Sequence, residues 1–349
     1  MIYFIIIIST IIAIFGAIFI RPIMSMFGVD GEILEYGILY GRIMFITLPA
    51  FILQYTYQCF FVAAEKPNLS LVFMVASGVT HVALDWIFIA IFDWGILGAA
   101  YACAVGQIIG GVGPLIYFAR KNSSLLRLTK TKFYGKVLWK TCTNGSSEMV
   151  TNLSTSVMNM IYNFQLLRIA GEDGVVAYGV IMYIYVIFTG VFFGYSIGSS
   201  PIVGYHYGAG NTDELKNMFK KGIVLMAVLG VGMLAAAEIL NVPLVRTFTS
   251  YDEELFRMTS RGFRIYSCSF LFMGFNIWAS GFFTALNNGA VSAAISFVRT
   301  FVFQIAAIFI LPLLIGIDGI WSAIVAAEFI SVFMSVAFLY AYRKRYQYV

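Results

Sequence analysis

The chain has 349 residues, of which 60% are hydrophobic and only 11% are charged, and its formal net charge is +5. Its mean hydropathy is +0.88. This composition excludes an ordinary soluble domain, in which about a quarter of the residues are charged, and it indicates an integral membrane protein.

Ten apolar stretches are long enough to cross a bilayer, for which a helix needs roughly 20 residues. In chain order they cover residues 3–24, 34–63, 69–91, 96–118, 143–167, 175–203, 222–245, 262–286, 290–314 and 317–341. They lack the ten-residue alternation of barrel strands. We therefore predict an all-α membrane protein with about ten transmembrane helices.

The last hundred residues repeat residues 30–118, displaced by about 222 positions. Asp30, Glu32, Arg42, Ile43, Phe60, Phe61, Ala63 and Ser70 are matched by Asp252, Glu254, Arg264, Ile265, Phe282, Phe283, Ala285 and Ser292. After a shift of two, Gly95-Ile96 falls on Gly319-Ile320. Such duplication is typical of transporters with two pseudo-symmetric lobes. Because the counterparts of residues 137–209 would precede Met1, we predict four helices in the first lobe, which lacks its first two, and six in the second.

The longest polar loop, residues 119–140, is the predicted linker between a first lobe at 1–118 and a second at 141–349. It carries seven basic residues and no acid: Arg120, Lys121, Arg127, Lys130, Lys132, Lys136 and Lys140. The positive-inside rule places this loop and the basic C-terminal tail in the cytoplasm. We expect a multi-pass protein of the cell membrane that works as a monomer in the lipid bilayer. No basic cluster is interleaved with aromatic residues, so we expect no nucleic-acid partner.

Motifs of catalytic and metal sites give no support to an enzyme. The cysteines at 59, 103, 142 and 268 lack the paired spacing of disulfides or zinc ligands. Gly194-Tyr195-Ser196-Ile197-Gly198 fits a nucleophile elbow, but it falls inside a long hydrophobic helix instead of a strand-to-helix turn. We expect no catalytic residues, no metal and no cofactor.

One predicted helix, 143–167, carries a polar stripe. Its polar residues recur every three to four positions on one face: Asn144, Glu148, Asn152, Thr155, Asn159 and Asn163. Such a stripe must face a neighbouring helix or a water-filled cavity. A hydrogen-bonded seam between helices is the structural alternative. We favour a substrate cavity lined by residues 152 to 163 of the stripe, in which Glu148 carries a proton or pairs with a cation.

Asp85 is a second acid within an apolar span, where it costs roughly 2.5–3.5 kcal/mol on insertion scales. Ser77 and His81 share its helical face at spacing four. A His–Asp pair can hold a proton, and a carboxylate with other oxygens can hold Na⁺. A salt bridge that only fixes helix packing is the alternative. Gln54 and Gln58 share another face and are predicted either to line the cavity or to pack.

Other polar residues within spans give weaker signals. Arg299 is expected to pair with an acid that the sequence does not identify, or to extend its charge to the membrane surface. Glu328 is expected to be a polar group of the core. Gly106 and Gly110 form a small-xxx-small pair, which predicts close helix packing.

The segment Pro201-Ile202-Val203-Gly204-Tyr205-His206-Tyr207-Gly208-Ala209 resembles the Pro-Ile-x-Gly-Tyr-Asn-Tyr-Gly-Ala signature of multidrug and toxic compound extrusion (MATE) transporters. Further motifs of the family are similar and occur in the family's order: Leu84-Asp85 with Ile87-Phe88 in its fifth helix, Gly98-Ala99-Ala100 in the sixth, Asn144-Gly145 with Glu148 in the seventh, and Arg299 with Pro312 in the eleventh. The resemblance covers essentially the whole chain, as helices three to twelve of twelve.

The resemblance implies two lobes in a V that alternate access and export cationic or amphipathic drugs in exchange for Na⁺ or H⁺. In the family, the cation site of the first lobe uses a helix-one acid, an Asn and an Asp four residues apart, and a Thr. Asp85 matches the Asp, whereas His81 replaces the Asn and Cys103 replaces the Thr. Imidazole and thiol are poor ligands for Na⁺. The two replacements therefore weigh against Na⁺ at this site and fit coupling to H⁺ or a changed substrate, and the resemblance leaves both H⁺ and Na⁺ as coupling ions. The alternatives are a lipid or polysaccharide flippase of the same superfamily and a non-functional transporter fragment.

Overall fold

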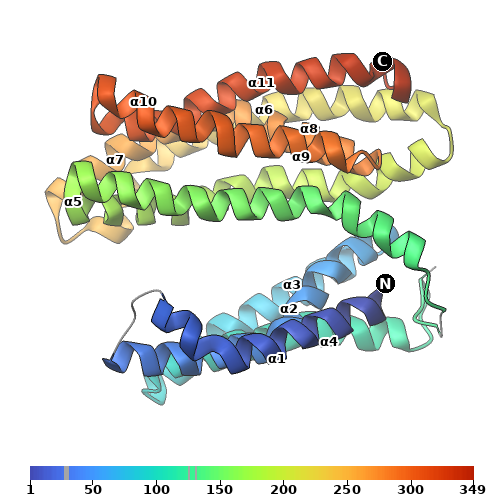
Figure 1. The fold of residues 1–349 in the computed structure, drawn as a ribbon, viewed down its shortest axis with the longest axis horizontal. Helices are drawn as coiled ribbons and strands as arrows, with labels where there is room; N and C mark the ends of the chain where they lie inside the picture. Colours follow the sequence, from blue (N-terminus) through green and yellow to red (C-terminus); the bar gives the residue numbers. More distant parts are fainter. Residues whose placement is uncertain (27–30, 125, 130–131) are drawn as a thin grey trace. The chain divides into compact units, whose positions relative to one another are not determined.

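The structure is a computed structural model, and it describes residues 1–26, 31–124, 126–129 and 132–349, without the side chains of Met26, Ile33, Ser147 and Glu148. The regular elements in this part of the chain are all helices (Figure 1). They form two compact units, which we call unit 1 (Met1–Tyr134) and unit 2 (Gly135–Val349).

Unit 1 contains four long helices: α1 (Ile2–Met26), α2 (Gly31–Ala63), α3 (Pro67–Asp85) and α4 (Gly95–Ala119). A π-helical segment, η1 (Trp86–Ile91), continues α3 without a break. Pro67 begins α3, where its missing N–H leaves no hydrogen bond unmade. The apolar core holds α2 against α4, and in it the rings of Tyr57 and Phe118 stack 5.4 Å apart.

Unit 2 begins with α5 (Gly135–Gly208), which spans 74 residues and has a non-helical residue, Gly171, at φ 68°. Figure 1 shows the chain reversing direction within α5, so α5 is a pair of antiparallel limbs. The remaining elements are α6 (Thr212–Thr249), α7 (Glu253–Ser267), α8 (Phe270–Ala285), α9 (Gly289–Phe297), η2 (Val298–Gln304, a π-helix), α10 (Ile305–Ile315) and α11 (Ile317–Tyr346).

Side chains in the loops of unit 2 determine where several of its helices begin. Asn211, Asp252 and Asn288 each accept hydrogen bonds from backbone N–H groups in the first turn of α6, α7 and α9. These caps satisfy donors that an α-helix leaves unpaired at its N-terminus. The core between the helices contains several large aromatic side chains, of which Trp278, Trp321 and Phe270 are almost completely buried.

The described helices agree with the ten predicted spans. Among the described residues, eight helices are long and apolar enough to cross a membrane, or nine if α7 and α8, bent by 50°, are counted as one broken span. The reversal at Gly171 divides α5 into two limbs, each long enough to cross. The segment predicted at 290–314 corresponds to α9, η2 and α10 together, which run from Gly289 to Ile315.

Candidate functional site

Three helices of unit 1 surround an open hollow of ≈ 240 Å³. Its polar lining comes from Gln54 on α2, Ser77 and His81 on α3, and Cys103 and Gln107 on α4. The structure therefore brings together three of the site residues predicted from the sequence: Gln54, His81 and Cys103. Gln58 instead borders a separate space of ≈ 10 Å³ beside Tyr57.

A pair of hydrogen bonds fixes the three helices around the hollow. Ser77 Oγ donates to the carbonyl of Gly106 at 2.7 Å, and Gln54 Nε2 donates to Ser77 Oγ at 3.4 Å. The contact depends on glycine, because a Cβ on Gly106 would lie 3.1 Å from His81 Cβ and 3.2 Å from the Ser77 carbonyl. The close packing predicted for Gly106 and Gly110 is confirmed, with Gln54 lying against Gly110.

His81 and Asp85 lie one helical turn apart on α3 and are in direct contact, with Nε2 3.3 Å from Oδ2. The second oxygen of Asp85, Oδ1, is buried and has no hydrogen-bond partner. The side chains are 40% and 32% exposed, so the pair is partly covered by protein. Asp85 is also the residue after which α3 becomes the π-helix η1, a distortion that is frequent at functional sites.

Cys103 lies beside the pair but offers little to a cation. Its sulfur accepts a hydrogen bond from Gln107 Nε2 at 3.3 Å. Hard cations such as Na⁺ prefer several oxygen ligands. Among the described residues, no cluster of His, Cys, Asp and Glu side chains is large enough to hold a metal ion.

In unit 2, the predicted stripe lies on one face of the first limb of α5. Asn152, Thr155, Asn159 and Asn163 are exposed, whereas Ser154, Met158, Tyr162 and Leu166 point into the core. Asn159 accepts a hydrogen bond from Tyr178 Oη on the second limb at 2.8 Å. At the start of the stripe, Asn144 Nδ2 donates to the Thr284 carbonyl of α8 at 3.3 Å, so two members of the stripe bond to neighbouring helices of unit 2. Glu148 belongs to α5, but its side chain lies outside the described residues.

A buried charged network in unit 2 joins α8, η2 and α11. Arg299 Nη1 lies 3.4 Å from Glu328 Oε1, and their side chains are only 12% and 7% exposed. Asn276 Nδ2 donates to Glu328 Oε2 at 2.8 Å and to the Glu328 carbonyl at 2.9 Å. Glu328 is thus the partner of Arg299 that the sequence did not identify. Asn276 was missed, although it lies 222 positions after Gln54.

Arg299 also borders a smaller polar space of ≈ 90 Å³. The hydroxyl groups of Thr151, Ser196, Ser280 and Ser296 contribute to its lining. Since a water molecule needs roughly 10–15 Å³ of such volume, this space suits a few waters and is too small for a drug. Ser196 lies here on a continuous helix, so it is not a nucleophile on a strand-to-helix turn.

Comparisons with known proteins agree with this architecture. The family model MatE matches residues 1–87 and 149–310. The multidrug export protein MepA of Staphylococcus haemolyticus (strain JCSC1435) is 25% identical over 348 residues, which are 99% of this chain and 75% of the relative. MepA of Staphylococcus aureus (strain NCTC 8325 / PS 47) is 23% identical over 94% of this chain and 72% of its own length.

Solved structures with this fold are also transporters. One is the outward-facing conformation of a multidrug resistance MATE family transporter of the MOP superfamily, with a TM-score of 0.90 at 20% identity, covering 99% of this chain and 78% of that one. Another is a variant of the Vibrio cholerae MATE transporter VcmN, with a TM-score of 0.88 at 18% identity, covering 98% and 78%. The family model, the relatives and the fold agree with the motifs in the chain, which belongs to the MATE family of membrane transporters.

Proposed function

We propose that the protein exports amphipathic or cationic compounds in exchange for protons. The observation that carries this proposal is the His81–Asp85 pair beside the hollow of unit 1. A charge within a membrane span is retained where it has a partner and a function, and Asp85 keeps one carboxylate oxygen unpaired. Relatives named as multidrug export proteins support the substrate class.

Proton coupling is favoured over Na⁺ coupling by the groups around Asp85. An imidazole and a thiol stand where oxygen ligands would be needed for a hard cation. An imidazole beside a carboxylate can exchange a proton with water near neutral pH. In this proposal the drug and the proton bind in alternation, and neutralisation of Asp85 favours one of the two access states.

Replacement of Asp85 by Asn tests the proposal. We expect Asp85→Asn to abolish efflux of a cationic dye from cells that lack other pumps, with membrane insertion unchanged. Glu65→Gln is the matched control, because Glu65 is an exposed acid in the loop between α2 and α3. If Asp85→Asn cells export the dye at the wild-type rate, the acid has a packing role and the proposal is wrong.

The coupling ion is tested with reconstituted vesicles. An imposed proton gradient should drive dye uptake in wild-type protein, and a Na⁺ gradient should not. His81→Asn places the family's own residue beside Asp85, and we expect it to weaken the response to the proton gradient several-fold. An unchanged response of His81→Asn would show that His81 takes no part in coupling.

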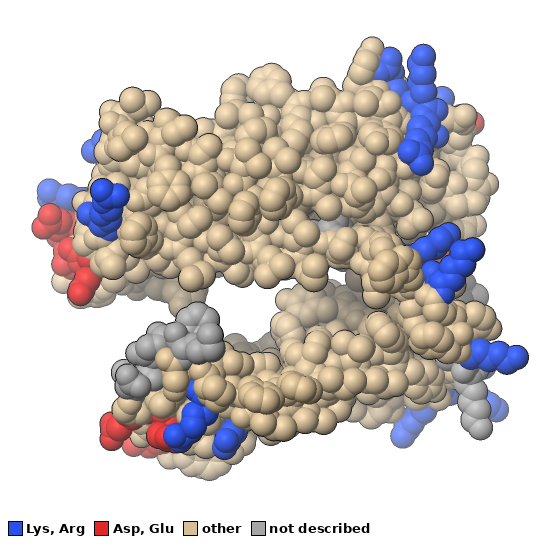
Figure 2. All heavy atoms as spheres, in the orientation of Figure 1, with Lys and Arg blue, Asp and Glu red and all other residues tan. Residues whose placement is uncertain are grey.

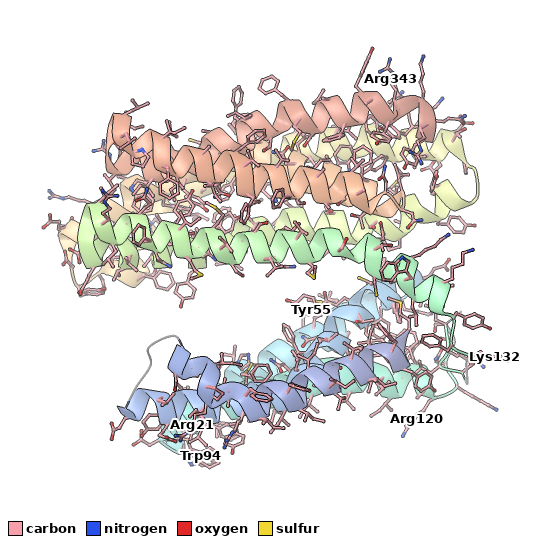
Figure 3. All side chains as sticks on the ribbon, viewed as in Figure 1. Arg21, Tyr55, Trp94, Arg120, Lys132 and Arg343 are labelled. Atoms are coloured by element: carbon pink, nitrogen blue, oxygen red, sulfur yellow. The ribbon has the colours of Figure 1, made fainter. Side chains whose placement is uncertain are left out.

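The proposal also includes an orientation in which the C-terminus is cytoplasmic. Lys and Arg side chains gather at the end of unit 2 where α11 ends, as Figure 2 shows. In unit 1, Trp94 and Arg120 mark opposite ends of α4 (Figure 3). A cysteine introduced at position 120 should resist impermeant maleimide added to intact cells, whereas one at position 93 should react. The reverse pattern would overturn the orientation.

A further inference from the structure

A second polar hollow, of ≈ 280 Å³, lies at one end of unit 2, away from the buried network described above. The last turn of α5, the turn before α6 and the end of α11 meet there. Its polar lining consists of His206, Asn211, Thr212, Arg345 and Gln347. Tyr207 and Tyr346 border it, with their rings 5.5 Å apart.

The hollow presents hydrogen-bond donors that the protein does not use. Among the described residues, the guanidinium of Arg345 has no carboxylate partner, and it lies 5.5 Å from the ring of Tyr346 and 5.9 Å from the ring of Tyr342. His206 Nδ1 is buried and has no hydrogen-bond partner. The hydroxyl of Thr212 and the side-chain amide of Gln347 also line the hollow, and neither makes a side-chain hydrogen bond within the described chain. Asn211 uses its oxygen to cap α6 and keeps its Nδ2 group.

The charge around the hollow is mostly positive. Six basic residues lie in the first three turns of α6 and the last turn of α11: Lys216, Lys220, Lys221, Arg343, Lys344 and Arg345. Only two acids, Asp213 and Glu214, are in the first turn of α6, and the Glu214 carboxylate accepts from Asn217 at 3.0 Å. Figure 2 shows Lys and Arg gathered at this end of α11, and Figure 3 shows Arg343 projecting from it. An anion is therefore the preferred occupant.

The C-terminal wall of the hollow is held in place. Gln347 adopts the left-handed conformation at φ 55°, which ends α11 and turns the chain back. Tyr348 then packs against Phe219, with ring centroids 4.8 Å apart, and donates from its Oη to the Leu339 carbonyl at 2.6 Å. Burial raises the pKa of Tyr348, so this hydroxyl stays protonated and keeps donating.

We propose that this hollow binds a phosphate group, with Arg345 as the principal ligand and Thr212, His206 and Gln347 as further donors. A guanidinium binds phosphate through two parallel N–H donors. The hollow is slightly smaller than a typical site for a drug-sized ligand, and it suits a single tetrahedral headgroup. It adjoins the tyrosines and basic residues typical of the membrane surface.

An anionic phospholipid and a soluble phosphate share this chemistry. Either one joins the turn before α6 to the end of α11, because its ligands come from both segments. Binding to the folded state alone stabilises that state by mass action. The inference concerns a surface of unit 2 that takes no part in the proposed transport chemistry at Asp85.

The test measures ligand-induced stabilisation of the full chain purified in a neutral detergent. Thermal unfolding is followed by tryptophan fluorescence during titration with inorganic phosphate or with dioctanoyl phosphatidylglycerol, at constant ionic strength. Dioctanoylglycerol, which has no phosphate, is the control ligand. We expect saturable stabilisation by at least one phosphate compound and none by dioctanoylglycerol.

The variants identify the site. Arg345→Gln should raise the half-saturating concentration at least about tenfold, equivalent to ~1.4 kcal/mol, and Arg345→Lys should have an intermediate effect. Lys344→Gln removes the same charge from a neighbouring exposed residue outside the lining, and it should change the concentration less than about twofold.

The two titrations separate the sources of phosphate. An Arg345-dependent response to the lipid alone assigns the site to a headgroup, and one to inorganic phosphate alone assigns it to a soluble phosphate. A response to both assigns it to the shared phosphate group. Equal weakening by Arg345→Gln and Lys344→Gln, or no saturable response to either compound, would overturn the proposal.

Discussion

Within each unit, a polar contact links three helices that correspond to each other in the sequence repeat, but the two contacts differ in charge. In unit 1, Gln54 on α2 bonds to Ser77 on α3, which bonds to the backbone of α4. In unit 2, Asn276 lies 222 positions after Gln54, and Arg299 lies 222 positions after Ser77. Both side chains contact Glu328 on α11. The first contact is neutral and the second is charged. The duplicated fold thus keeps the place of the contact between helices and changes its charge.

The two units also differ in how their acids within the membrane spans, Glu328 and Asp85, are surrounded. The Glu328 side chain is 7% exposed, and its carboxylate has both an ionic and an amide partner. The Asp85 side chain is 32% exposed and retains an unpaired oxygen. A buried acid whose two oxygens both have partners stabilises one packing arrangement, whereas the partly exposed Asp85 contributes less to packing. We therefore expect unit 2 to lose more stability than unit 1 when its contact is broken.

The largest expected effect comes from Glu328→Gln. This change leaves the Arg299 charge buried without a counter-charge, and loss of one partner of a buried pair costs about 3–5 kcal/mol. The apparent free energy of unfolding in detergent should fall by that amount. The double variant Arg299→Met with Glu328→Met should recover most of it, because both charges are then removed. Wild-type stability of Glu328→Gln would show that the network contributes nothing.

A smaller effect is expected from Gly111→Ala in unit 1. A Cβ at this position would lie 2.1 Å from the Ala50 carbonyl oxygen, so α4 would have to move away from α2. Overpacking of this kind costs about 1–3 kcal/mol. Gly232→Ala on α6 is the control, because a Cβ there has open space around it. Equal melting temperatures of the two variants would contradict the close approach of α2 and α4.

Ser77→Ala should cost less again, about 1 kcal/mol, the contribution of a typical neutral hydrogen bond. The Gly106 carbonyl still has its position in the hydrogen-bond ladder of α4, so no charge and few polar groups are left unpaired. Ser9→Ala removes a buried hydroxyl that bonds only to Ile6 of its own helix, at 3.1 Å, and should be nearly neutral. If Ser77→Ala lowered the free energy of unfolding as much as Glu328→Gln does, the neutral and the charged contact would contribute equally to stability, contrary to this expectation.

Much of the fold follows from the sequence, because membrane helices are local structures recognised by length and hydropathy. The spacing of the stripe predicts one helical face of α5, and Asn152, Thr155, Asn159 and Asn163 are exposed on the helix that the structure forms there. The partner of Arg299 was not predictable, since Glu328 is 29 positions away and only helix packing brings the two side chains together. Asn276 was detectable in principle as the repeat counterpart of Gln54, but a single amide in an apolar span gives no signal of its own.

Substitutions in the stripe of unit 2 are expected to have the smallest effect on stability but a large effect on transport. Thr155 bonds only to the Thr151 carbonyl of its own helix, and both Thr155 and Asn163 are exposed. Thr155→Val and Asn163→Leu should therefore change the free energy of unfolding by less than about 0.5 kcal/mol, as exposed substitutions usually do. If the stripe lines a substrate cavity, dye efflux should nevertheless fall several-fold. Phe164→Leu, on an exposed apolar residue of the same limb, should leave both quantities unchanged. Unaltered efflux in Thr155→Val and Asn163→Leu would mean that the polar face of α5 does not meet the substrate.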